Sequence, residues 1–102
     1  MISLKKLFTP VKSINADEAK KFIVGQEEGA YTLLDVRQPG EYEIEHIPGA
    51  MLIPLPGLKD SRSRLDSQKP VVVYCASGGR SLAAAQLLSG LGFDEIYNLQ
   101  GG

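Results

Sequence analysis

Two mainly apolar runs along the chain have the pattern of buried β-strands, at residues 31–36, with Thr32 as an exception, and at residues 71–74. A strand that is apolar at successive positions has both faces covered, which is typical of a parallel sheet packed between helices. A further strand is expected over residues 94–99. Shorter strands are expected at residues 13–14, at an edge of the sheet, and at residues 51–53.

The segment after the first short strand has helical periodicity. Asn15 and Glu18 have the three-residue spacing of a helix N-cap and its reciprocal partner. Ala19, Phe22 and Ile23 then form an apolar stripe beside exposed lysines. We expect this helix to end at the glycines that follow.

Two more helices are expected, over residues 55–65 and 81–91. In the first, Leu58 and Leu65 face inward, and the charged residues form a solvated outer face, with docking of a partner as the alternative. The second helix presents one apolar face and has Gly92 just past its end. That face is formed by Ala84, Leu87, Leu88 and Leu91.

Strands that alternate with helices indicate an α/β fold, here with a mainly parallel sheet of about five strands. The chain has 102 residues and a mass of 11.0 kDa, which is enough for one domain. We expect an N-terminal arm over residues 1–12 and the folded domain over residues 13–102.

The composition excludes several classes of function. A net charge of −1 and a pI near 5.8 provide no global field for nucleic acid or an anionic membrane. The N-terminus lacks the apolar run of a signal peptide, and no stretch approaches the roughly 20 apolar residues of a membrane span. One cysteine permits neither an internal disulfide nor a cysteine-based metal cluster, which fits a reducing compartment. We therefore expect a cytoplasmic protein with no metal and no cofactor.

The cysteine lies at the carboxyl end of the central strand, where open α/β sheets bind ligands. Small residues follow Cys75 before the helix, so successive N–H groups can turn inward as a cradle for an anion. The helix start and Arg80 add positive charge, and such surroundings favour a thiolate. The alternative is an inert buried cysteine. The small residues are Ala76, Ser77, Gly78 and Gly79, with Ser81 after the arginine.

The cysteine loop closely resembles the active-site loop of the rhodanese family of sulfurtransferases in its short single-domain form. Further matches occur in the family's order, so that the resemblance extends from residue 14 to the last residue. The resemblance implies a three-layer α/β/α fold. The matching stretches are YCASGGRS at 74–81, LDVR at 34–37 with Glu41 and Tyr42, HIPGA at 46–50 with Ile53 and Pro54, Gly92 with Phe93, and YNLQGG at 97–102.

The resemblance also implies a reaction. Cys75 would take a sulfane sulfur from thiosulfate or another persulfide donor, hold it as a persulfide, and pass it to cyanide, a thiol or a carrier protein. The N–H groups of residues 76–81 would hold the persulfide as an anion. Arg80 would either steer the donor or anchor the loop, and Ser77 and Ser81 would donate to the outer sulfur or cap the helix, with capping expected for Ser81.

Three charged residues near the same sheet edge are expected to support the site. The strand at residues 31–36 delivers Asp35 and Arg37 to this edge, and Glu41 lies four residues after Arg37, so the last two are expected to form an ion pair. His46 is expected to hydrogen-bond its own turn, with a catalytic Cys–His pair as the alternative. Glu45 departs from the family pattern, in which a glycine usually precedes the histidine.

Two rival functions remain beside sulfur transfer. One is a non-catalytic or slow persulfide-carrying module that binds a partner. The other is a cysteine-dependent phosphatase or arsenate reductase, but these have one residue more between cysteine and arginine than the six-residue span from Cys75 to Arg80. The family usually continues beyond the glycine pair at residues 101–102, so the chain is expected to be trimmed there or to be part of a longer protein.

Overall fold

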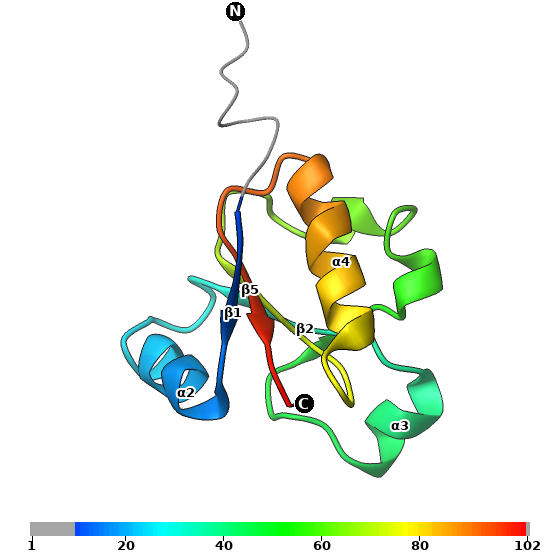
Figure 1. Ribbon diagram of the computed structural model, residues 1–102, viewed down its shortest axis with the longest axis horizontal. Coiled ribbons are helices and arrows are strands. Elements are labelled where there is room, and N and C mark those ends of the chain that lie inside the picture. The colour runs from blue at the N-terminus through cyan, green and yellow to red at the C-terminus, as the bar shows by residue number, and fades with distance from the viewer. Residues whose placement is uncertain (1–9, 102) are drawn as a thin grey trace, which may run out of the picture.

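The computed structural model describes residues 10–101, which form a five-stranded parallel sheet with helices on both faces (Figure 1). The strand order is β1-β5-β4-β2-β3. This three-layer α/β/α arrangement confirms the predicted fold class. The strands are β1 (Val11–Ile14), β2 (Thr32–Asp35), β3 (Met51–Leu52), β4 (Val71–Tyr74) and β5 (Ile96–Leu99). The helices are α2 (Ala16–Val24), α3 (Pro39–Ile44) and α4 (Gly79–Gly90), with 3-10 turns η1 (Leu55–Gly57) and η2 (Arg62–Arg64).

The central strand β4 is buried at all four positions, as its continuous apolar run predicts. Successive side chains of a strand point to opposite faces. Val71 and Val73 therefore belong to the core beneath α4, whereas Val72 and Tyr74 belong to the core on the opposite face. Cys75 continues this alternation and lies on the α4 side.

Helix α4 covers one face of the sheet through small and branched side chains. Ala84, Ala85 and Leu88 are fully buried against the strands, and Leu87 and Leu91 pack at the margin of this core. The predicted apolar face is therefore confirmed. The two alanines allow close packing of α4 on the sheet, where the helix contacts both β4 and β5.

Helix α2 covers the other face. Its N-terminus has the predicted capping box: the Glu18 amide donates to the Asn15 side chain at 2.9 Å, and the Asn15 amide donates to the Glu18 carboxylate at 3.1 Å. Ala19 is buried, and Phe22 packs against Tyr31 and Tyr97. The helix ends at Val24 with Gly25 as its C-cap, as expected.

Strand β1 begins at Val11, two residues before the strand expected from the sequence. Val11 and Lys12 pair in parallel register with Ile96 and Tyr97 of β5. Backbone hydrogen bonding therefore makes them part of the strand, although the Lys12 side chain is exposed. Residues 1–9 of the expected arm lie outside the described residues. Among the helices of residues 10–101, none has the length and apolar character required to cross a membrane.

The prediction of a helix over residues 55–65 is wrong. The segment instead forms the two 3-10 turns η1 and η2, separated by turns. Pro54 and Pro56 remove backbone donors and Gly57 weakens helical propensity, so no continuous α-helix forms. The side-chain pattern is nevertheless preserved, since Leu58 is fully buried and Leu65 packs at the edge of the core.

Truncation of Leu88 to alanine should destabilise the fold by about 2–5 kcal/mol, because it leaves a cavity in the core beneath α4. Alanine is the best helix former, so lost helical propensity does not contribute. Urea denaturation followed by circular dichroism measures the change. The control is Val24→Ala at a position that is 84% exposed, where we expect a change within about 0.5 kcal/mol. Equal losses in the two variants would contradict this account of the core.

Candidate active site

The carboxyl ends of β2 and β4 bring Asp35 and Cys75 to the same edge of the sheet. Asp35 is the last residue of β2 and pairs with Tyr74, the residue before Cys75. The Cys75 residue is only 1% exposed. The chain then turns back through three small residues into α4, so the sulfur lies between the end of the strand and the start of the helix.

Backbone amides of the loop converge on the Cys75 sulfur. The Gly78 amide donates to Sγ at 3.1 Å and the Ser81 amide donates at 3.3 Å. Gly78 makes the turn possible, because its φ of +95° lies in the left-handed region that a side chain at this position would strain. The amides of Gly78 and Ser81 therefore turn inward, as the sequence predicts.

These hydrogen bonds change the ionisation of the thiol. Burial of Cys75 opposes ionisation and is the largest single influence. The Ser81 hydroxyl and amide and the amides of Ser77 and Gly78 together outweigh it, and they hold the pKa of Cys75 below its ordinary value of 9.0. The loop therefore favours a buried thiolate that is bound by N–H groups.

The prediction that Ser81 caps α4 is wrong. Helix α4 begins at Gly79, two residues earlier than expected, and its N-cap is Gly78. The left-handed turn at Gly78 leads directly into helical backbone, so Ser81 is already the third residue of the helix. Its hydroxyl is fully buried and lies 3.1 Å from the Gly78 carbonyl oxygen and 2.5 Å from Oδ1 of Asn98.

Arg80 is held by Glu41 through two parallel hydrogen bonds. Nη1 donates to Oε1 at 2.8 Å and Nη2 donates to Oε2 at 3.0 Å. The prediction that Arg37 and Glu41 form an ion pair is therefore wrong, because Glu41 pairs with Arg80. Their four-residue spacing makes neighbours only within a continuous helix, whereas α3 begins after Gln38, whose backbone is extended. The observed pair connects α3 to the first turn of α4.

Arg37 pairs instead with Asp35, whose side chain is fully buried. The guanidinium donates to both carboxylate oxygens at 2.9–3.1 Å, and the Arg37 amide adds a bond of 2.9 Å. Burial opposes the ionisation of Asp35, but these bonds and one from the Tyr74 hydroxyl outweigh it and keep the pKa below 3.8. Asp35 is therefore a buried anion whose cost of burial is offset by its hydrogen bonds and by the charge of Arg37.

The same network fixes the loop between α3 and β3. Arg37 donates from Nη2 to the Glu45 carbonyl oxygen at 2.6 Å. The Ile47 amide donates to the Tyr74 hydroxyl at 3.1 Å, and the Arg37 guanidinium lies 5.5 Å from the centre of the Tyr74 ring. The sequence alone does not predict this role for Tyr74, because an aromatic residue in an apolar strand predicts only packing.

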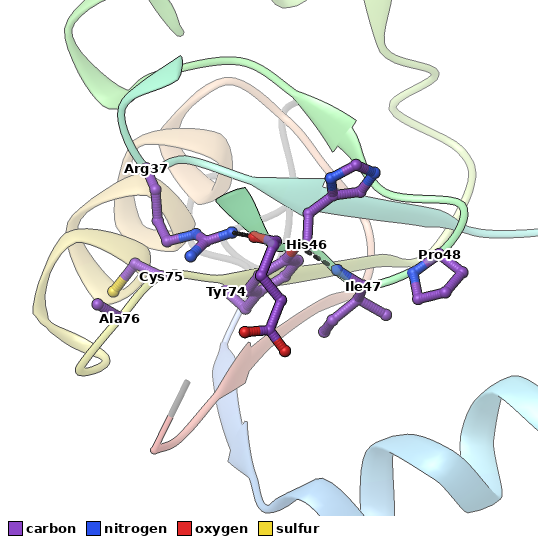
Figure 2. Close-up of a pocket in the computed structure, with 8 residues that line it drawn as sticks. Arg37, His46, Ile47, Pro48, Tyr74, Cys75 and Ala76 are labelled. Atoms are coloured by element: carbon purple, nitrogen blue, oxygen red, sulfur yellow. Dashed lines mark hydrogen bonds between the residues drawn. The ribbon is translucent and has the colours of Figure 1, made fainter. Parts of the chain in front are cut away.

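His46 belongs to this loop and is held by Tyr42. Its Nδ1 lies 2.8 Å from the Tyr42 carbonyl oxygen, and the two rings stack with centroids 3.7 Å apart. A carbonyl oxygen only accepts, so Nδ1 carries the proton. In Figure 2 the ring extends away from Cys75. This geometry supports the structural role expected for His46.

A cavity of about 440 Å³ opens between this loop and the end of β4 (Figure 2). Of the residues expected at the site, Cys75, Ala76 and Arg37 line it. The other loop residues, 77–81, lie outside the lining and surround the sulfur from the α4 side. The remaining lining residues are Glu45, His46, Ile47, Pro48 and Tyr74.

Asn98 is a second residue beside the site that the sequence alone does not predict. It is 4% exposed and lies in the middle of β5. The signal that could have identified it is an amide side chain inside an otherwise apolar parallel strand, because buried polar groups need hydrogen-bond partners.

The sequence and the fold of the chain match those of known proteins. A sequence profile of the Rhodanese-like domain matches residues 15–102. Protein YqhL of Bacillus subtilis (strain 168) is 50% identical over 70 residues, which are 69% of this chain and 56% of that protein. Thiosulfate sulfurtransferase GlpE of Pseudomonas syringae pv. syringae (strain B728a) is 36% identical over 94 residues, which are 92% of this chain and 85% of that protein.

A solved structure agrees with these matches. The crystal structure of a rhodanese-related protein from Thermoplasma volcanium superimposes with a TM-score of 0.77 at 38% identity, and covers 89% of this chain and 85% of that one. A parallel α/β domain with a cysteine loop at its carboxyl edge is thus the class of protein that fold and site define. The chain belongs to the rhodanese-like domain family. It spans about half the length, 56%, of the YqhL relative.

Replacement of Glu41 by glutamine should flatten the acid dependence of stability. Pairing with Arg80 is the main cause that lowers the pKa of Glu41 from 4.5 to about 2. A lowered native pKa stabilises the fold above the unfolded value, and this contribution disappears as the pH falls from about 4.5 to about 2. Thermal unfolding across this range should therefore show a smaller decline for Glu41→Gln than for the wild type.

The matched control is Glu43→Gln, which removes the same charge from the same helix at an exposed position. We expect this variant to retain the wild-type acid dependence. If both variants flatten the curve equally, the general charge of α3 would account for the effect and the Arg80 pair would not.

Proposed function

We propose that this protein is a sulfurtransferase that carries a sulfane sulfur on Cys75. The observation that carries the proposal is the pair of backbone amides, from Gly78 and Ser81, that donate to one buried sulfur. Amides that are already in place stabilise a sulfur anion without reorganisation at the moment of reaction. The match to a thiosulfate sulfurtransferase over 92% of the chain supports the same reaction class.

The first step is attack by the Cys75 thiolate on the outer sulfur of the donor. With thiosulfate, a bond forms between Sγ and that sulfur, the sulfur–sulfur bond of thiosulfate breaks, and sulfite leaves with the electron pair. The cavity lined by Cys75, Ala76 and Arg37 provides the approach to the sulfur. The lowered pKa of Cys75 provides the thiolate that this step needs.

The second step returns the sulfur to an external acceptor. Cys75 is the only cysteine in the chain, so no internal thiol can resolve the persulfide. An acceptor thiolate, or cyanide, attacks the outer sulfur, takes it, and leaves Cys75 as the thiolate. A thiol of a small molecule or of a carrier protein serves equally in this scheme, because the chemistry requires only the nucleophile.

The position of Arg80 supports sulfur transfer over phosphate chemistry. A cysteine-dependent phosphatase needs an arginine that is available to bind the phosphate oxygens. Here the guanidinium of Arg80 makes both of its parallel hydrogen bonds to Glu41. The six-residue span from Cys75 to Arg80 is also one residue shorter than the phosphatase pattern. The loop therefore fits a sulfur anion better than a phosphate.

The near-complete burial of Cys75, at 1% exposure, favours one alternative. A sulfur that is covered in this way exchanges slowly with large acceptors, so the domain would act as a persulfide carrier with slow turnover. Turnover in a thiosulfate and cyanide assay distinguishes the two functions. A carrier forms the persulfide once and then releases its sulfur slowly, whereas an enzyme transfers sulfur to the acceptor repeatedly.

Intact-mass measurement after incubation with thiosulfate tests the proposal. We expect the wild type to gain the mass of one sulfur atom and to lose it again when a thiol is added. Cys75→Ser should show no gain, and Ser77→Ala should retain it because the substitution leaves the donating amides of Gly78 and Ser81 in place. An unmodified wild type that hydrolyses a phosphomonoester would instead assign the protein to phosphate chemistry.

A further inference from the structure

Asn98 forms a buried hydrogen bond to the serine that contacts the Cys75 sulfur. Its Oδ1 lies 2.5 Å from Oγ of Ser81, and Oγ in turn lies 3.4 Å from Sγ of Cys75. Asn98 is 4% exposed and Ser81 is fully buried. The three side chains come from β5, α4 and the end of β4, so only the tertiary fold brings them together.

The Ser81 hydroxyl has one hydrogen and three possible partners. Gly78 offers a carbonyl oxygen at 3.1 Å, Asn98 offers Oδ1, and Cys75 offers its sulfur. The Gly78 carbonyl already accepts the Leu82 amide at 3.0 Å and lies farther from Oγ than Oδ1 of Asn98 does. The main competition for this hydrogen is therefore between Asn98 and the sulfur.

The ionisation of Cys75 changes what the hydroxyl must do. When Cys75 is a thiol, its S–H donates to Oγ and the hydroxyl donates to Oδ1 of Asn98, as the geometry shows. When Cys75 is a thiolate, the hydroxyl stabilises it only by donating to Sγ. Two oxygens 2.5 Å apart would then face each other with no hydrogen between them.

An amide resolves this conflict because it has both an acceptor end and a donor end of similar size. Rotation of the Asn98 amide by half a turn presents Nδ2 to Oγ, and the N–H then donates to the serine. We propose that Asn98 is a positioning residue for Cys75, whose amide directs the Ser81 hydroxyl hydrogen toward the ionised sulfur. The inference rests on the proposed function, in which Cys75 is the nucleophile.

The test is a double-mutant cycle on the alkylation of Cys75 by iodoacetamide as a function of pH. Cys75 is the only cysteine, so alkylation reports this thiol alone. Asn98→Leu keeps a similar shape but removes both hydrogen-bonding ends. We expect it to raise the pKa of the thiol and to slow alkylation at neutral pH by about fivefold, the effect of one lost hydrogen bond. In the Ser81→Ala background it should change the rate by less than about twofold.

Two outcomes would overturn the inference. Either Asn98→Leu leaves the alkylation profile unchanged while Ser81 is present, or it shifts the profile equally with and without Ser81. Tyr97→Phe is the matched control, because it removes a polar group from the adjacent position of β5 whose partner is Glu95, and it should match the wild type. Circular dichroism confirms that each variant is folded.

If Asn98→Leu does not fold, Asn98→Asp keeps the acceptor end and removes the donor end. The added charge slows alkylation in either background. A larger effect with Ser81 present than in Ser81→Ala supports the inference, and an equal effect overturns it. Alkylation requires no sulfur donor, so a wild type that fails to form a persulfide refutes the proposed function without deciding the role of Asn98.

Discussion

The convergence of backbone amides on one sulfur, at the point where β4 ends and α4 begins, is the constraint on which the site depends. A cysteine with 1% exposure would ordinarily remain a neutral thiol, because burial disfavours charge. Here the turn at Gly78 aims amides at the sulfur, and the close packing of α4 on the sheet keeps them in place. The same contacts that exclude water therefore stabilise the anion.

The charged side chains around this loop form ion pairs that hold neighbouring segments together. Asp35 engages Arg37 and Glu41 engages Arg80, so each nearby arginine is matched by a carboxylate. The first pair fixes the loop between α3 and β3 along the cavity, and the second ties α3 to α4. Attraction for an anionic sulfur consequently comes mainly from backbone dipoles. Because the attraction comes from backbone N–H groups and not from unpaired side-chain charges, a domain with a net charge of −1 can still favour an anion at this one site.

The family membership and the geometry complement each other. The match over residues 15–102 places the chain among rhodanese-like domains, and the hydrogen bonds at Cys75 give a physical basis for the sulfur transfer proposed for this chain. Asn98 and Tyr74 extend the site below the loop, into the strands themselves. The sheet is thus part of the chemical environment of the sulfur as well as its support.

The sequence by itself determined the fold class, the capping box of α2, the apolar face of α4 and the position of Cys75 at the end of a buried strand. These features depend on short-range periodicity, capping and backbone preferences, which are readable from neighbouring residues. Only the tertiary structure decided that Arg80 pairs with Glu41, that Arg37 turns to Asp35, and that Asn98 reaches Ser81. Each of these partners is chosen by how the elements pack, since a polar side chain has many possible partners in the sequence and very few within hydrogen-bond distance in the fold.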